Sequence, residues 1–173
     1  MSKRLALSFA RLALLTLAGG LAACGGGSSD PAEATDAGYQ ALGAQDYATA
    51  RSEFEAALEA IGEDTSHPSY VKARLGSIQA ACRTDPGRAE SELLALSQAV
   101  PDAVTERTYA DIAGRLGDGG NFTEAIALLD AGKQRFPDSA TLDGLGKKLV
   151  KQAEQAGDSG ALDALAGLGY AGD

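Results

Sequence analysis

The chain repeats one spacing of small and large residues three times. A glycine or alanine is followed 12 or 13 residues later by an alanine, and a large apolar residue stands four positions after that alanine. Residues four apart share one face of a helix, and small side chains let two helix backbones approach closely. The spacing therefore predicts repeated pairs of closely crossing helices. The three sets are Gly38, Ala50 and Phe54; Gly76, Ala89 and Leu93; and Ala113, Ala125 and Leu129.

The composition agrees with an all-α fold. The chain has no tryptophan and only 5% aromatic residues, whereas a sheet would favour more aromatic and β-branched side chains. Asp85-Pro86, Asp102 and Asn121 are typical of helix starts, and Gly62 and Pro137 are typical of helix ends. The predicted helices are 31–44, 46–61, 67–82, 86–99, 102–117, 121–135 and 139–156, and a short capping helix over 161–168 is predicted within the glycine-rich C-terminal segment 157–173.

The repeat resembles the tetratricopeptide repeat (TPR). The alanines at 50, 89 and 125 are 39 and 36 residues apart, close to the roughly 34 residues of that family's unit. The resemblance implies that residues 31–156 form antiparallel helix pairs stacked as a short solenoid. An unrelated helical bundle is the alternative. The third unit carries the family's pattern best, through Tyr109, Ile112, Ala113, Leu116, Gly120, Phe122, Ala125, Leu129 and Pro137.

The first 23 residues have the pattern of a secretory signal. Lys3, Arg4 and Arg11 precede an apolar run from Leu12 to Ala23. That run is too short for a membrane-spanning helix, which needs about 20 apolar residues. We therefore expect residues 1–23 to be a signal peptide.

The signal ends in Leu21-Ala22-Ala23-Cys24, which resembles the bacterial lipoprotein box. The resemblance implies a diacylglyceryl group on Cys24, cleavage before it, and stable attachment to a membrane through several acyl chains. The alternative is ordinary cleavage after Ala23, which would leave a free thiol. Residues 24–30 would then form the lipidated cysteine and a flexible tether. Gly25 follows the cysteine in place of an inner-membrane retention aspartate, so we expect the periplasmic side of the outer membrane if two membranes are present.

The charge and the scarcity of reactive side chains limit the function. Residues 24–173 hold 12 basic and 24 acidic side chains, a net charge of −12, which argues against a nucleic-acid partner. His67 is the only histidine, and Cys82 is the only cysteine after Cys24. We interpret His67 as part of a helix start and Cys82 as a small buried residue. We therefore predict no enzyme activity, no cofactor and no metal site.

The resemblance also implies where a partner would bind. In similar repeats the first helix of each pair lines a concave face that holds a segment of another protein. That arrangement places Tyr39, Tyr70, Arg107, Lys147 and Lys151 on or near the face, although both tyrosines could equally be packing residues. We thus predict a lipid-anchored envelope scaffold or assembly factor. The alternatives are a purely structural accessory that holds a larger complex to the membrane and, less favoured, a small-ligand carrier or enzyme.

Overall fold

The predicted all-α fold is confirmed. The computed structural model describes residues 30–170, in which every regular element is helical. The predicted signal peptide, Cys24 and residues 24–29 of the tether lie outside the described residues. No helix within 30–170 is long and apolar enough to span a membrane. The helices are α1 (Pro31–Gly43), α2 (Tyr47–Ile61), α3 (Tyr70–Thr84), α4 (Pro86–Ala99), α5 (Glu106–Asp118), α6 (Phe122–Arg135), α7 (Ala140–Ala156) and α8 (Ser159–Gly167), with a short 3₁₀ turn, η1 (Pro101–Ala103), before α5.

Short polar side chains start most of these helices. An aspartate or serine just before the first turn accepts a hydrogen bond from a backbone N–H that has no partner within the helix. The accepting residues are Asp30, Asp46, Asp85, Ser139 and Asp158, at 2.8 to 3.3 Å from the donor nitrogen. The capping pattern explains why the helix boundaries could be predicted closely.

Two helix starts differ from the prediction. The helix expected from residue 67 begins at Tyr70, because His67 lies in a turn where its Nδ1 accepts from the Ser69 N–H at 3.1 Å. The helix expected from residue 102 begins at Glu106. Thr105 and Thr108 cap each other's backbone N–H there, and Asp102 falls in η1. Both helices therefore begin a few residues later than predicted, and of the two only α5 has a side-chain cap at its start.

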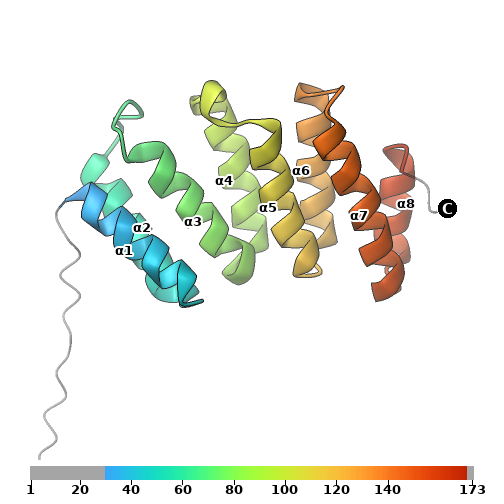
Figure 1. Cartoon of the computed structure of the whole chain (residues 1–173), viewed down its shortest axis with the longest axis horizontal. Coiled ribbons are helices and arrows are strands. Elements are labelled where there is room, and N and C mark those ends of the chain that lie inside the picture. The colour runs from blue at the N-terminus through green and yellow to red at the C-terminus, as the bar shows by residue number, and fades with distance from the viewer. Residues whose placement is uncertain (1–29, 171–173) are drawn as a thin grey trace, which may run out of the picture.

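The helices form two layers, which Figure 1 shows as a row of successive helix pairs. α3 contacts α1 and α5, and α5 contacts α7, so the odd-numbered helices form one layer. In the second layer, α6 contacts both α4 and α8. We call the two layers the odd layer (α1, α3, α5 and α7) and the even layer (α2, α4, α6 and α8), in which the Arg88–Glu55 ion pair of 2.9 Å joins α4 to α2. Each helix also packs against its neighbour in the chain, so adjacent helix pairs are the basic packing unit.

The predicted close crossings occur around Phe54. This ring is fully buried, and the backbones of Gly38 and Gly76 lie directly against it. A Cβ atom at Gly38 would stand 2.6 Å from the ring, and one at Gly76 would come closer still. Ala50 and Ala57 are fully buried beside it. The Phe54 side chain of α2 therefore packs against both α1 and α3.

The C-terminal end packs in a similar way. Leu165 of α8 is fully buried, and α8 contacts both α6 and α7. Tyr170 then folds back onto α7, where its ring fills the space beside Gly146 and its hydroxyl donates to Asp143 at 3.0 Å. This helix spans 159–167, close to the predicted 161–168.

Candidate functional site

Two adjoining hollows lie on the odd layer. The first, of about 370 Å³, lies between α1, α3 and α5, and the second, of about 320 Å³, lies between α3 and α5. Gln79 lines both of them. We therefore treat them as one surface feature, the Gln79 groove, which crosses three helices of one layer.

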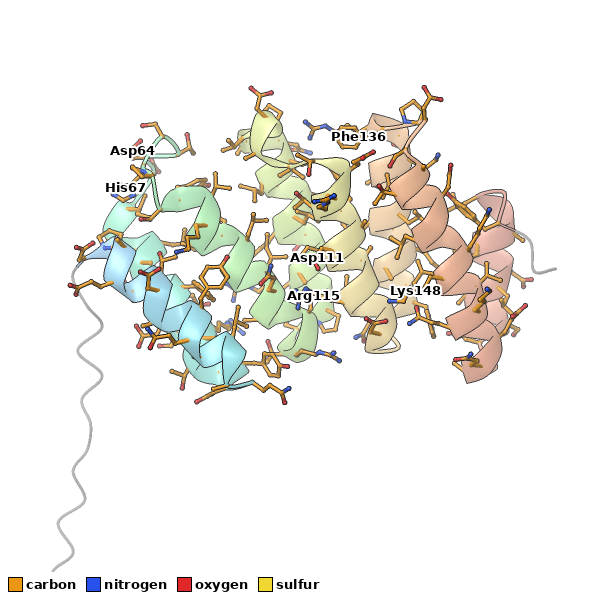
Figure 2. The ribbon with its side chains drawn as sticks, viewed as in Figure 1. Asp64, His67, Asp111, Arg115, Phe136 and Lys148 are labelled. Carbon is orange, nitrogen blue, oxygen red and sulfur yellow. The ribbon has the colours of Figure 1, made fainter. Side chains whose placement is uncertain are left out.

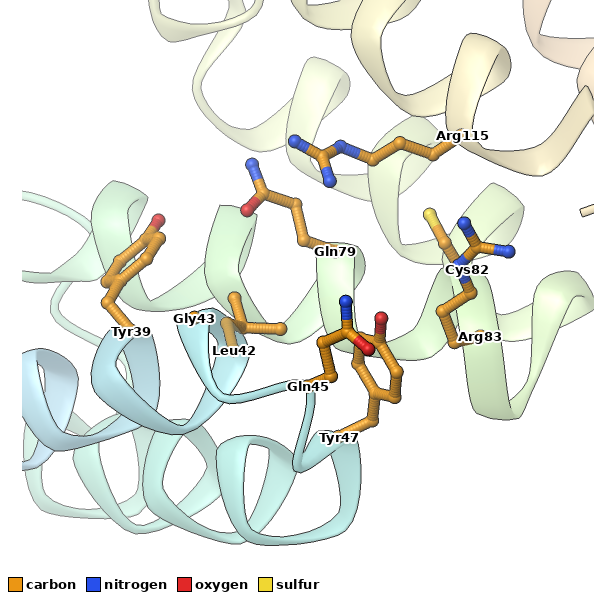
Figure 3. A pocket seen from close by; sticks show the side chains of 9 residues that line it. All are labelled: Tyr39, Leu42, Gly43, Gln45, Tyr47, Gln79, Cys82, Arg83 and Arg115. Carbon is orange, nitrogen blue, oxygen red and sulfur yellow. The ribbon is translucent and has the colours of Figure 1, made fainter. Parts of the chain in front are cut away.

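The first hollow is polar and has a cationic side. Tyr39 of α1 and Tyr47 at the start of α2 line it on one side, and Gln79 and Arg83 line it from α3. Figure 3 shows the Arg115 side chain reaching from α5 toward Gln79. The lining thus offers guanidinium and amide N–H groups together with two phenol rings, which suits a polar or anionic ligand.

The second hollow adds one more cation. Arg107 and Thr108 line it from the first turns of α5, opposite Leu75 of α3. Asp111 lies in the same hollow and accepts a hydrogen bond from Arg115 Nε at 3.0 Å. Asp111 is the only carboxylate among the residues that line either hollow. The groove therefore has an excess of positive charge within an acidic protein.

Two ionisable groups of the groove stay neutral. Burial raises the pKa of Tyr39, with Arg115 acting in the opposite direction, and the Tyr39 hydroxyl donates to the Lys72 carbonyl at 3.0 Å. Burial likewise raises the pKa of Cys82 to about 11, so its thiol is protonated at neutral pH and unreactive. Cys82 is 1% exposed. The interpretation of Cys82 as a small buried residue is thus confirmed.

Only two of the predicted partner-binding residues line the groove. Tyr39 and Arg107 do so, and the Tyr39 ring also packs edge-on against Phe54 at 5.0 Å between centroids. Tyr70 does not line the groove, because it is 7% exposed and lies in the core, beside α4. It is the first residue of α3, and its side chain belongs to the core cluster that also includes Ile61 of α2 and Leu96 of α4. The packing interpretation therefore holds for Tyr70.

The predicted lysines lie farther along the odd layer. Lys147 and Lys151 are exposed on α7, and their spacing of four residues puts them on one face. The lysine between them, Lys148 (labelled in Figure 2), bonds to Asp118 of α5 at 2.6 Å. Neither Lys147 nor Lys151 lines the Gln79 groove. They could contact only a ligand that extends beyond it.

The sequence interpretation missed Gln79, Arg83 and Arg115, although a signal for them exists. Gln79 and Arg83 follow Leu75 at intervals of four, and Arg115 follows Arg107 and Asp111 in the same way. These two stripes face each other across the groove. Pairing them requires knowing that α3 and α5 are neighbours in space.

Within 30–170, no group of three or more His, Cys, Asp and Glu side chains could hold a metal ion. Comparison of the chain with protein-family models, characterised proteins and solved structures finds no match. The Gln79 groove and the N-terminal sequence pattern are therefore the features that bear on function.

Proposed function

We propose that this protein is a lipid-anchored lipoprotein of the bacterial cell envelope that binds a segment of a partner protein in the Gln79 groove. The N-terminal sequence supports the anchor, through the basic start, the apolar run and the Leu-Ala-Ala-Cys box. The groove supports the binding role. On this proposal the protein is a scaffold or assembly factor, and it works by binding.

The same proposal includes a TPR-like arrangement of the helix pairs, with α8 as the cap. The supporting features are the two layers and the recurrence of small residues at the crossings of α1, α3 and α7. Leu165 and Ala161 of α8 cover apolar surface that α6 and α7 would otherwise expose. In such an array the odd layer would be the concave, partner-binding face.

The observation that carries the binding proposal is the position of the groove. It crosses three consecutive helices of one layer, so its length suits a chain segment better than a compact metabolite. Its lining includes tyrosines and arginines, which are enriched at protein interfaces. The alternative is a structural accessory that contacts a larger complex through the even layer.

Site-specific photo-crosslinking in the native host separates these functions. A photo-reactive amino acid at Gln79 should trap one discrete partner, because Gln79 lies where the two hollows meet. The matched control is the same amino acid at Gln98, an exposed glutamine on α4 of the even layer. Crosslinks at Gln98 but not at Gln79 would favour the structural accessory.

A further inference from the structure

We propose that the segment bound in the Gln79 groove is acidic, and that its carboxylates pair with Arg83, Arg107 and Arg115. This inference rests on the proposed function, since it specifies the chemistry of the partner at the same site.

Basic residues are concentrated on the odd layer. Of the 12 basic residues after residue 23, eight lie on α3, α5 and α7. α3 carries three basic residues and no acidic one within Tyr70–Thr84. The chain as a whole has a net charge of −9. The positive charge around the groove is therefore local, and it contrasts with the rest of the protein.

The basic residues of the even layer already have partners. Arg51 pairs with Glu55 at 2.9 Å, and Arg88 pairs with Glu92 at 2.6 Å. Lys133 pairs with Asp143 at 2.8 Å. Arg135 donates to the carbonyl oxygen of Pro101 at 2.7 Å. Each of these four basic side chains of the even layer therefore already contacts another group of the protein.

Two groove arginines differ in this respect. Within residues 30–170, no carboxylate lies at ion-pair distance from Arg83 or Arg107. Asp118, whose pKa Arg83 helps to lower, is already bound by Lys148 at 2.6 Å and by Gln152 at 2.7 Å. An incoming carboxylate would therefore be a new partner for each arginine.

Arg115 completes the cationic set. Its Nε bonds to Asp111, which leaves the outer guanidinium nitrogens facing the first hollow (Figure 3). Guanidinium groups bind carboxylates in a two-pronged geometry, which favours acidic side chains over diffuse negative charge. The amide of Gln79 is placed to bond to the backbone of the same segment.

The test uses the full chain in a neutral detergent and a fluorescent peptide of alternating glutamate and alanine. We expect saturable binding of this peptide, weaker binding at higher salt, and none for the peptide with glutamine in place of glutamate. The double variant Arg83→Gln/Arg107→Gln should weaken binding at least tenfold. The charge-matched control Arg51→Gln/Arg88→Gln, on the even layer, should change it less than twofold.

Three results would overturn the inference. Equal weakening by the two double variants would show attraction by overall charge, without a role for the groove. Preferential binding of micelles doped with anionic phospholipid would identify a lipid surface. If the glutamate peptide fails to bind although Gln79 crosslinks a partner, the groove binds a non-acidic segment and the proposed function survives. Circular dichroism checks the fold of each variant, and the single Arg107→Gln, at an exposed position, provides a second measurement.

Discussion

At the scale of the residue, Gln45 has a sterically unfavourable backbone conformation. Its φ is +61°, and it is the only non-glycine residue with a positive φ within 30–170. It closes α1 through the Asp46 N–H to Ala41 carbonyl bond of 2.9 Å. The same bond pattern ends α5, α7 and α8, and glycine occupies the left-handed position in all three, at Gly120, Gly157 and Gly169.

Gln45 also lines the Gln79 groove, which gives a reason for its presence. Backbone strain of this kind is often kept where a side chain serves a site. On the proposed function, the Gln45 amide would contribute to binding, at some cost in stability.

The prediction is that Gln45→Gly raises the free energy of unfolding by about 0.5–1 kcal/mol, because glycine adopts a positive φ without a steric penalty. The matched control is Gln40→Gly, at an exposed helical position of α1, which should lower it by a similar amount. Urea denaturation measures both changes. If both variants are less stable, contacts of the Gln45 side chain contribute more to the free energy of unfolding than relief of its backbone strain does.

At the scale of the element, the spacing between neighbouring helices is set by glycine against a large ring. Gly38 of α1 and Gly76 of α3 both lie directly against the Phe54 ring, as described above. Gly146 receives the Tyr170 ring in the same manner. Any side chain at these glycines would push the helix pairs apart, so the closeness of the layers depends on them.

The element-scale prediction compares two glycine-to-alanine changes in helices. Gly76→Ala should lower the free energy of unfolding by about 1–3 kcal/mol, because its Cβ would overlap the fully buried Phe54 ring. Gly144→Ala, in α7, should raise it by up to about 1 kcal/mol, because nothing lies within 4 Å of the added Cβ and alanine favours helix. Chemical denaturation gives both values. If the free energy of unfolding rises in both variants, the Phe54 ring can move away from residue 76 without a loss of stability.

At the scale of the whole molecule, the layers separate two kinds of surface. The even layer has its cations paired internally, whereas the odd layer presents the arginines of the Gln79 groove. A lipid on Cys24 would hold the whole domain within a short tether's reach of the membrane. The binding surface would then act close to the bilayer.

The whole-molecule prediction concerns this attachment. Cys24→Ser should abolish incorporation of labelled palmitate and release the protein from membranes or leave its precursor uncut, because serine cannot form the thioether. Cys82→Ser is the matched control and should leave labelling unchanged, since Cys82 is buried and its thiol protonated. Palmitate labelling that persists in the Cys24→Ser protein would contradict the lipoprotein proposal.

The sequence by itself determined the helices and several of their crossings. Caps such as Asp46 and Ser139 act within three residues, and the spacing of Gly38, Ala50 and Phe54 follows helical periodicity. Such features depend on near neighbours in the chain, so they can be predicted from it. The start of α5 was harder to predict from the sequence, because Thr105 and Asp102 are both plausible caps. Only the reciprocal bond between Thr105 and Thr108 decides between them.

Only the tertiary structure decided which side chains share a surface. Tyr39 and Tyr70 look alike in the sequence, yet one lines the groove and the other is buried against α4. Arg83 and Arg115 are 32 residues apart and meet because α3 and α5 are neighbours in one layer. Periodicity fixes the face of a helix on which a residue lies. The neighbour that this face meets is set by the packing of all eight described helices together.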